Sequence, residues 1–517
     1  MARVLWIDDE IELLKPHIIF LKEKGNDVDI AYNGEDAVEM VRKNEYDIVF
    51  LDEMMPGMDG LTTLEKIKSI QPYLKVVMVT KSEEESLMEE AIGAQIDDYL
   101  TKPVNPSQIL LAMKKLLEST QLSQQRMTMD VLQDIRNITE ALGNVQSIDD
   151  WYRIFDSLVR NELVLDKNPD SGIKESLLDL QKECNKEFSK YMENNYLHWI
   201  HSEHNRPLFS TDIVSNYVYP LLDANEPTLF IIIDCLRYDQ WMAMEELLAP
   251  YFEISKDFFI SILPTATPFS RNALFSGLFP IDIQKKEPSI YARDLEDESG
   301  ANRFEWQLLD FNLRKLGYKP KKDIKYSKVF SNDEIKPLLH NVDTYSRADI
   351  SALVINSVDI IAHNRSDSPV MKEIAPNEQA YRQLTKTWFE HSPLYDLFKL
   401  IARTKTKIVL TSDHGSIRVM RGAKVLADRE SSVNLRYKFG RNLKVNEKQA
   451  VIIKSPVDYK LPDYGPSTQF IIAKEDNFFV YPTNYNHYLN HYRDSFQHGG
   501  ISMEEMILPV ITMKGKE

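Results

Sequence analysis

The sequence predicts an α/β multidomain protein in which two sheet-containing domains flank a helical segment. Three observations predict this architecture. In residues 1–118, short apolar runs alternate with helical patterns at roughly 20–25-residue intervals, the rhythm of a parallel, doubly wound sheet. In residues 119–205, glycine and proline nearly vanish and apolar residues keep helical spacing. In residues 206–517, buried-strand runs that end in polar residues return.

Composition limits the classes of function that this chain can serve. Its 517 residues carry a formal net charge of −17, which argues against a general nucleic-acid coat or binding to an anionic membrane surface. Only two cysteines occur, which suits a reducing compartment. Acidic residues interrupt the apolar start of the chain, and no apolar run approaches the ~18 residues of a membrane span. We therefore expect a soluble cytoplasmic protein without membrane insertion.

The first 118 residues place polar side chains where predicted strands end. The predicted strands are the runs Val4–Ile7, Val28–Ala31, Ile48–Leu51, Val76–Val79 and the segment near Tyr99. The polar residues that follow the strands are Asp8, Asp9, Asp52, Thr80 and Lys102. Three carboxylates that converge on one cleft repel each other, and a hard divalent cation such as Mg²⁺ relieves that repulsion. One carboxylate is then a nucleophile toward a phosphoryl donor, while the lysine neutralises charge and the threonine hydroxyl contacts the new phosphate.

These positions, with the segments 52–60 and 102–103, closely resemble the receiver domain of two-component response regulators. The resemblance implies a flavodoxin-like fold and a sensor histidine kinase as partner. It also implies that Asp52 is the phosphoryl acceptor, and that Asp8 and Asp9 bind Mg²⁺ together with it.

The same resemblance assigns roles to the last two strands. It implies that Lys102 contacts the phosphate and that Thr80 and Tyr99 form the switch pair. Lys102-Pro103 matches a position where that family has a cis peptide.

Residues 119–205 are predicted to form a three-helix connector. Apolar residues at helical spacing mark three segments, which begin near Met127, Trp151 and Leu177. Amphipathic helices of this kind form a small bundle or a dimerising hairpin. Nothing in these residues indicates chemistry, so we expect the connector to transmit the state of the first domain.

The remaining chain places aspartate, histidine and threonine side chains after buried-strand runs or in loops. In sequence order these residues are Asp234, Thr267, Asp359, His363, Asp413, His414 and His498. Asp413 and His414 directly follow a strand-like run, while Asp359 and His363 lie four residues apart, so one helical turn brings both to a single ion. Mixed aspartate and histidine ligands suit Zn²⁺, and two such ions would clamp a phosphate and lower the pKa of the threonine hydroxyl.

This order resembles the alkaline phosphatase superfamily over residues 206–517, and the segments 264–271 and 429–441 resemble a PglZ domain within it. The resemblance implies an α/β domain with a central, mostly parallel sheet. It implies two sets of zinc ligands, Asp359, His363 and His498 for one ion and Asp234, Asp413 and His414 for the other. Thr267 would lie between the ions, as a ligand and as the nucleophile.

Thr265 is the competing nucleophile. Thr267 is preferred because Pro268 suits the first turn of a helix, which makes Thr267 the N-cap beside the positive end of the helix dipole. Arg271, one helical turn farther on, is a candidate contact for a bound phosphate.

A basic run indicates where a substrate would bind. Between Arg418 and Lys444, eight Lys or Arg residues stand against two acids. Electrostatic focusing there favours an anionic substrate larger than phosphate, such as a nucleotide or oligonucleotide phosphodiester; a solvated hairpin or a domain contact is the alternative. The candidate contacts are the basic residues Arg436, Lys438 and Arg441, with the aromatic residues Tyr437 and Phe439 available to stack a base.

A receiver, a helical connector and a PglZ domain in this order resemble response regulators tied to type IX secretion. That resemblance implies regulation through protein contacts, with a sigma factor as a candidate partner, and homodimerisation on phosphorylation. We therefore predict a response regulator that controls a zinc-dependent phosphodiesterase. The first alternative is a metal-stabilised, non-catalytic scaffold that binds a regulator. The second is a DNA-binding transcription factor, which the acidic composition disfavours.

Overall fold

The computed structural model describes residues 2–81, 96–167, 171–288, 304–319, 324–342, 345, 348–427, 432 and 434–516. The chain divides into two compact units, Met1–Val131 and Leu132–Glu517. Each unit has its own hydrophobic core residues. Among the described residues, no helix is both long and apolar enough to cross a bilayer.

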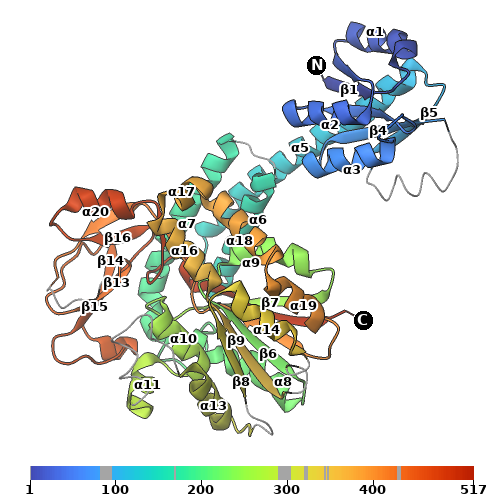
Figure 1. Cartoon of the computed structure of the whole chain (residues 1–517). Coiled ribbons are helices and arrows are strands. Elements are labelled where there is room, and N and C mark those ends of the chain that lie inside the picture. Colours follow the sequence, from blue (N-terminus) through green and yellow to red (C-terminus); the bar gives the residue numbers. More distant parts are fainter. Residues whose placement is uncertain are drawn as a thin grey trace. The chain divides into compact units, whose positions relative to one another are not determined.

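The first unit contains a five-stranded parallel sheet in the order β2-β1-β3-β4-β5 (Figure 1). Its strands are β1 (Arg3–Ile7), β2 (Asp27–Ala31), β3 (Ile48–Asp52), β4 (Lys75–Thr80) and β5 (Asp98–Thr101). The parallel register aligns Val4 of β1 with Val28 on one side and with Ile48 on the other. β3 is buried along its whole length, as expected for a strand that helices cover on both faces.

Helices cover both faces of this sheet. They are η1 (Ile11–Leu14), α1 (Lys15–Glu23), α2 (Gly34–Lys43), α3 (Gly60–Ile70) and α5 (Pro106–Leu142). α2 and α3 bury Val38 and Leu64 in one core, whereas α1 and α5 bury Leu21 and Met113 in the other. The predicted doubly wound, flavodoxin-like architecture is therefore confirmed.

The predicted connector is helical. α5 runs without a break from Pro106 to Leu142, and α6 (Ile148–Lys167) and α7 (Ser171–Trp199) follow it. The predicted boundary at residue 118 falls inside α5, because no glycine or proline interrupts the helical pattern after its first residue. α6 and α7 pack through Trp151, whose ring centroid lies 5.3 Å from that of Phe188.

The second unit contains a six-stranded sheet in the order β7-β18-β10-β6-β9-β8 (Figure 1). Its strands are β6 (Thr228–Ile233), β7 (Phe252–Ile260), β8 (Lys325–Val329), β9 (Ile350–Ile355), β10 (Lys407–Thr411) and β18 (Ile507–Gly515). β10, β6, β9 and β8 pair in parallel, and β18 runs antiparallel to both of its neighbours. This is the predicted central, mostly parallel sheet.

Helices flank the large sheet on both sides. They are α8 (Tyr219–Asp223), α9 (Tyr238–Leu248), α10 (Thr267–Ser276), α11 (Pro280–Lys286), α13 (Glu305–Lys315), α14 (Asn332–Leu339), α16 (Ser357–Asp367), α17 (Pro369–Ile374), α18 (Glu378–Glu390) and α19 (Pro393–Ile401). Three short helical turns also occur, η2 (Ser210–Asp212), η3 (Val214–Val218) and η4 (Pro456–Tyr459). The register of β6 and β10 aligns Ile232 with Thr411, so the segments that follow both strands emerge at the same edge of the sheet.

Smaller sheets follow β10. Their strands are β11 (Ile417–Val419), β12 (Arg421–Lys424), β13 (Tyr437–Gly440), β14 (Ala450–Ile453), β15 (Gln469–Ala473), β16 (Asn477–Val480) and β17 (Ser495–Gln497). The last helices are α20 (Tyr485–Tyr492) and α21 (Met503–Met506). β11 pairs with β17 so that Ile417 lies opposite Gln497, which brings the loop after β17 beside the segment that follows β10.

Candidate phosphoryl-acceptor site and metal centre

Three carboxylates meet at the carboxyl edge of the first sheet. Asp8 and Asp9 follow β1, and Asp52 ends the neighbouring strand β3. One oxygen of each lies within 4.8 Å of the others. Nζ of Lys102 lies 2.8 Å from Oδ2 of Asp8 and 3.0 Å from Oδ2 of Asp52. The structure therefore brings together four of the five residues that the sequence predicts for phosphoryl transfer.

Burial and charge shape this cluster. Asp8 and Asp52 are buried, whereas Asp9 is exposed. Burial raises the pKa of Asp52 above its ordinary value, the hydrogen bond from Lys102 only partly offsets this, and the charge of Asp8 raises it further. A hard divalent cation would relieve the repulsion, and three carboxylate oxygens are ligands that suit Mg²⁺.

The predicted switch residues lie on neighbouring strands. Thr80 ends β4 and donates its hydroxyl hydrogen to the carboxylate of Glu53. Tyr99 lies in β5 opposite Met78 of β4, with 44% of its surface exposed. The peptide before Pro103 is cis, as predicted. The role of these residues as a switch pair stays a prediction.

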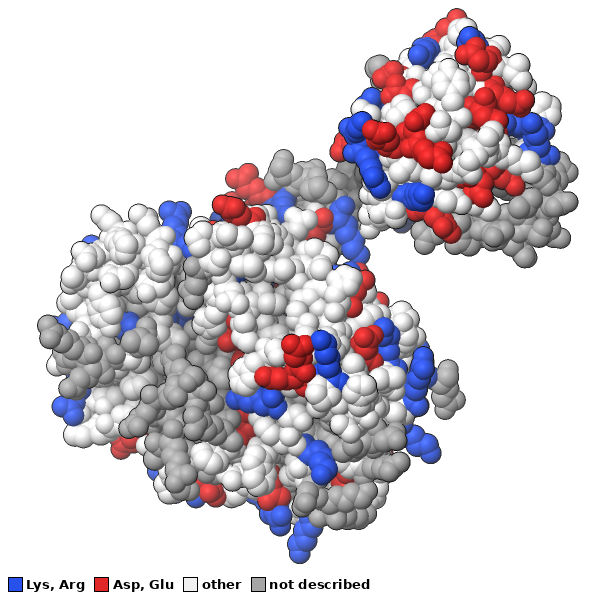
Figure 2. All heavy atoms as spheres, in the orientation of Figure 1, with Lys and Arg blue, Asp and Glu red and all other residues white. Residues whose placement is uncertain are grey.

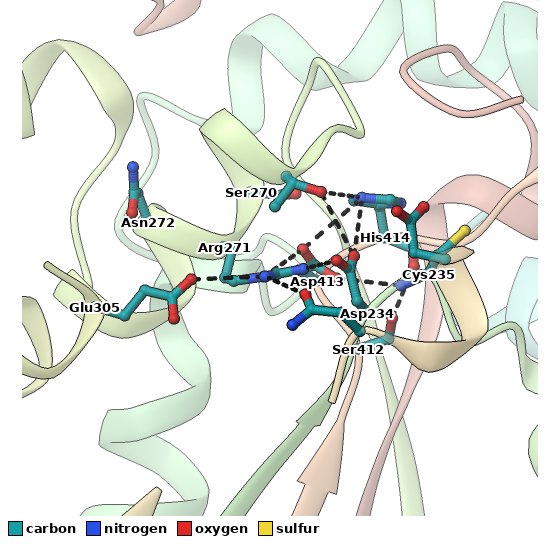
Figure 3. A network of polar contacts seen from close by, with 12 residues as sticks. Asp234, Cys235, Ser270, Arg271, Asn272, Glu305, Ser412, Asp413 and His414 are labelled. Atoms are coloured by element: carbon teal, nitrogen blue, oxygen red, sulfur yellow. Dashed lines mark hydrogen bonds and ion pairs between the residues drawn. The ribbon is translucent and has the colours of Figure 1, made fainter. Parts of the chain in front are cut away.

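The first predicted set of zinc ligands lies at the carboxyl edge of the large sheet. Asp234 follows β6, and Asp413 and His414 follow β10, the next strand in the sheet. All three are buried, and one ligand atom of each lies within 4.8 Å of the others. Nε2 of His414 lies 3.6 Å from Oδ1 of Asp234. Figure 3 shows this group from close by.

The second predicted set lies next to the first. Asp359 and His363 are one turn apart on α16, and His498 follows β17. Nε2 of His363 lies 3.5 Å, and Nε2 of His498 lies 3.8 Å, from Oδ1 of Asp359. The rings of His414 and His498 stack with their centroids 4.2 Å apart, so the two sets adjoin.

These residues fit a metal ion by two tests. Oδ1 of Asp359 and Nδ1 of His498 are buried and have no hydrogen-bond partner among the described residues, which is unusual for buried polar atoms. Burial and the neighbouring His414 and His363 hold the pKa of His498 well below its usual value, so its imidazole is neutral and free to ligate. A set of buried aspartates and neutral imidazoles suits Zn²⁺.

Thr267 lies at the junction of the two sets. Its Oγ1 lies 2.9 Å from Nε2 of His414 and 3.5 Å from Oδ1 of Asp234. α10 begins at Thr267 with Ala266 as N-cap, so the predicted N-cap assignment was wrong by one residue. The threonine hydroxyl is therefore directed at the candidate metal ligands His414 and Asp234 instead of capping the backbone of its own helix.

Thr265 has a different role in the structure. It is fully buried, and its hydroxyl donates to the carbonyl oxygen of Gly500 over 2.8 Å. The same hydroxyl accepts a hydrogen bond from the amide of Gly499 over 3.1 Å. Thr265 thus holds the loop that follows His498, and its oxygen is engaged on both sides.

The prediction that Arg271 contacts a bound phosphate does not fit its position. Its side chain is 1% exposed, and Nε donates to Oδ2 of Asp413 over 2.9 Å (Figure 3). The guanidinium also forms a close ion pair with Asp234, lies 3.6 Å from Oε1 of Glu305 and donates to Asn356 over 3.2 Å. A buried cation among three buried acids is needed to offset their charges, which leaves it no free face for a substrate.

This arrangement sets the charge of the ligands. Burial alone would raise the pKa of Asp413, but Arg271 and His414 outweigh it and hold the pKa below its usual value. Burial raises the pKa of Asp234 to about 7, against the opposing effect of Arg271. Glu305 was missed by the sequence analysis. The available signal was the arginine itself, because an arginine within an apolar helical segment requires an acidic partner.

The basic run is largely neutralised within the fold. Arg436, predicted as a substrate contact, is fully buried, and its Nη2 lies 2.5 Å from Oε2 of Glu505, so this prediction was wrong. Arg418 forms an ion pair with Asp494, and Nη2 of Arg421 lies 2.6 Å from Oε2 of Glu475. Figure 2 shows one face of the second unit, on which basic and acidic side chains are interspersed.

The other candidate substrate contacts divide into buried and exposed residues. Nζ of Lys438 is buried and donates to the carbonyl oxygen of Ser432 over 2.9 Å, whereas Arg441 is exposed. Tyr437 packs edge-on against Phe269 at 5.5 Å. Phe439, the other predicted stacking residue, stacks with the rings of Tyr464 and Phe470. Residues 428–431 and 433 of this segment lie outside the described residues.

Three family profiles match the chain in succession. The profile described as response regulator receiver domain matches residues 4–114, and that described as PorX response regulator linker domain matches residues 121–200. The profile described as BREX system PglZ alkaline phosphatase-like domain matches residues 213–513, more than half of the chain. The protein is thus a response regulator with a phosphatase-like domain. The chain belongs to the PglZ family of alkaline-phosphatase-like domains.

Individual relatives match only part of the chain. "Transcriptional regulatory protein SrrA" of Staphylococcus aureus (strains NCTC 8325 / PS 47 and COL) is 31% identical over 118 residues, which is 23% of this chain and 48% of the relative. This chain therefore spans about half the length of the curated relatives it matches. The solved Francisella response regulator 1452 receiver domain is 26% identical and covers 23% of this chain and 99% of its own, with a TM-score of 0.23. The solved structure of a two-component response regulator from Clostridium difficile is 31% identical and covers 23% of this chain and 97% of its own, with a TM-score of 0.22.

Proposed function

We propose that this protein is a phosphorylation-controlled phosphodiesterase whose PglZ domain uses two zinc ions and Thr267 as nucleophile. One observation carries the proposal: the hydroxyl of Thr267 lies 2.9 Å from Nε2 of His414, where the two sets of ligands adjoin. The free hydroxyl of a threonine is a weak nucleophile at neutral pH, so it reacts only where a neighbouring base or metal ion activates it.

Each set of ligands would hold one ion. The first ion would be held by Asp234, Asp413 and His414, and the second by Asp359, His363 and His498. When bound, a pair of zinc ions lowers the pKa of a neighbouring hydroxyl and neutralises charge on a phosphate. The rings of His414 and His498 stack with their centroids 4.2 Å apart, so the two sets lie side by side.

The chemistry at Thr267 proceeds in two balanced steps. Oγ1 attacks the phosphorus of a phosphodiester while the bond from phosphorus to the leaving oxygen breaks. The hydroxyl proton of Thr267 ends on that oxygen, so the leaving group departs as an alcohol. The product is a phosphothreonine that still carries the remaining nucleoside. Water then attacks the same phosphorus, the bond to Oγ1 breaks, and Thr267 regains its proton.

The substrate class rests on the exposed charge of the segment that follows β10. Four basic residues are exposed in the described part of the 418–444 segment, and Arg421 among them is paired with Glu475. The other three are Lys424, Arg441 and Lys444. Exposed cations in this segment of an acidic chain favour an anionic substrate there. Nucleotide and oligonucleotide phosphodiesters meet this requirement, and Arg441 is the remaining candidate among the predicted contacts.

The receiver supplies the control. Asp52 would accept a phosphoryl group from a sensor histidine kinase, with Mg²⁺ held by Asp8, Asp9 and Asp52 itself. Thr80 and Tyr99 would report the modification, and the phosphorylated protein would form a homodimer in the cytoplasm. The domain order further supports an output in type IX secretion, with a sigma factor as the partner.

Hydrolysis assays with the metal-stripped full chain test the proposal. Zinc should restore turnover of bis(p-nitrophenyl) phosphate and of a short oligonucleotide, and Thr267→Ala should lower it at least a thousandfold, since the nucleophile is lost. Thr139→Ala is the matched control, because Thr139 is exposed on α5. Turnover that survives in the Thr267 variant would refute the assignment.

A scaffold without turnover is the second candidate. Arg271, predicted to contact a phosphate, and Arg436, predicted to contact the substrate, are instead buried in ion pairs with acids of the fold. If zinc binds and stabilises the chain but no phosphodiester is hydrolysed, the domain acts as a metal-stabilised surface for a regulator such as a sigma factor.

A further inference from the structure

We infer that helix α7 of the linker is a positioning element of the metal centre, acting through a buried pair between Asn185 and Glu504. The inference rests on the proposed function in one respect, because it takes the two sets of ligands to bind metal. It goes further by naming the linker residues that hold the loop of His498 and the turn of His414.

The pair joins two segments that are far apart in sequence. Nδ2 of Asn185 donates to both carboxylate oxygens of Glu504, over 3.0 and 2.9 Å. Oδ1 of Asn185 accepts a hydrogen bond from the amide of Met503 over 2.8 Å. Nε2 of Gln181 adds a third bond to Glu504, over 2.9 Å. Both ends of the Asn185 amide are therefore used on the segment that follows His498.

The contacts lie along one stripe of α7. Residues four apart share a helix face, and the stripe consists of Gln181, Asn185, Ser189 and Glu193. Oγ of Ser189 donates to the carbonyl oxygen of Ile501 over 3.2 Å, and Glu193 accepts from Nζ of Lys474 over 2.9 Å. Asn185 and Ser189 are buried, where polar side chains are expected only with specific partners.

The other side of the same segment contacts the backbone beside two candidate ligands, one from each set. The amide of Gly415, next to His414, donates to the carbonyl oxygen of Glu505 over 3.1 Å. A Cβ at Gly415 would lie 1.9 Å from the carbonyl oxygen of Glu504, so only glycine permits this approach. The amide of Gly500, two residues after His498, donates to Oε1 of Glu505 over 2.8 Å. A shift of α7 therefore moves the turn of His414 and the loop of His498 together.

A reversal of the pair tests this inference. Asn185→Asp places two carboxylates against each other, and Glu504→Gln turns an amide donor toward the amide of Asn185. In the double variant the carboxylate and the amide have exchanged places. The amide introduced at position 504 donates to the carboxylate introduced at position 185, and this carboxylate also accepts from the Met503 amide, so each donor again has an acceptor. The readouts are the affinity for Co²⁺, measured by competition with a chelator, and the visible absorption of the Co²⁺-loaded full chain.

Each single variant should bind Co²⁺ about tenfold more weakly and shift the absorption bands, because partners behind metal ligands set their orientation. The double variant should return to within about threefold of wild type, with the wild-type spectrum. Asn194→Asp is the matched control, since Asn194 is exposed on the same helix, and it should change neither readout. Gln181→Ala removes only one of the bonds to Glu504, so it should fold and show a smaller loss of affinity, about threefold.

The outcomes separate this inference from the proposed function. Single variants, including Gln181→Ala, that bind Co²⁺ with wild-type affinity and spectrum would overturn the inference. Single variants that bind weakly without rescue in the double variant would also overturn it, since the loss would then come from general destabilisation. Wild-type protein that binds Co²⁺ but hydrolyses no diester would refute the proposed phosphodiesterase alone, because these readouts do not depend on turnover.

Discussion

The hydroxyl of Thr267 lies 2.9 Å from Nε2 of His414, although 147 residues separate the two in the chain. β6 and β10 are adjacent parallel strands, so the residues that follow them share one edge of the sheet. α10 starts at Thr267 and directs its side chain toward that edge. The proposed nucleophile therefore lies beside candidate metal ligands at the edge where β6 and β10 end and α10 begins. The predictions below follow from this geometry and from that of the receiver.

Phosphorylation of the receiver is expected at Asp52 alone. With Mg²⁺ and acetyl phosphate, the full chain should gain one acid-stable, base-labile acyl phosphate, because Lys102 and the neighbouring carboxylates are already in place. Asp52→Asn should abolish it in mass spectra of the intact protein. Asp59→Asn is the control, since Asn still caps α3 and Asp59 is outside the cluster. Modification that persists in the Asp52 variant would contradict the assignment.

Arg271 should stabilise the folded, metal-free protein. Arg271→Met leaves Asp234, Asp413 and Glu305 without their buried cation, so it should cost about 3–5 kcal/mol in the free energy of unfolding of the metal-free protein. Urea unfolding of the full chain measures this loss. The exposed Arg441→Met should stay within about 0.5 kcal/mol of wild type. A phosphate contact would give the opposite pattern, with wild-type stability and a raised KM.

A second buried charge cluster joins the linker to the PglZ domain. Arg382 of α18 contacts Glu162 and Asp166 of α6 at 2.5 and 2.8 Å, and Asp239 of α9 at 2.8 Å. Arg382→Met should lower the free energy of unfolding by about 3–5 kcal/mol, because three acids lose their common partner. In Arg160→Met, which removes an exposed pair with Asp156 on α6, the loss should be below about 1 kcal/mol. Equal losses in both variants, compared by thermal unfolding, would contradict the account.

Lys438 should make stability depend on pH. Burial lowers its pKa from 10.5 to about 8, so between these values the folded protein has released a proton that the unfolded chain still holds. The contribution of this residue to stability therefore grows as pH rises from 8 toward 10.5, and it is lost as pH falls through 8. The difference in unfolding free energy between wild type and Lys438→Met should change by about 2 kcal/mol in favour of wild type between pH 8 and pH 10. A difference that is constant with pH would show that the amine is solvated, as a substrate contact requires.

Local signals predicted much of the fold and most of the site. Apolar runs that end in aspartate gave Asp52, Asp234 and Asp413 their correct places, because a buried strand and its polar end lie within a few residues of sequence. The continuous helix α5 could not be divided at residue 118, since its helical pattern does not change there.

Residues whose role depends on a distant partner could not be assigned in this way. Arg436 lies among basic residues in sequence, but its partner Glu505 is 69 residues away, and only the fold brings them together. The same holds for Arg271 and Glu305, and for Asn185 and Glu504. Basic residues in a cluster thus indicated a substrate surface, whereas burial paired several of them with acids.

Trapping a covalent intermediate on Thr267 would test directly whether this residue is the nucleophile. Zinc-loaded protein is mixed with a nucleotide diester, quenched in acid within the first turnover, and digested for fragment-resolved mass spectrometry. We expect a nucleotidyl or phosphoryl group on Thr267 and none on Thr265, whose hydroxyl is held between Gly499 and Gly500. A group on Thr265, or steady turnover of the diester with both threonines unmodified, would contradict this expectation.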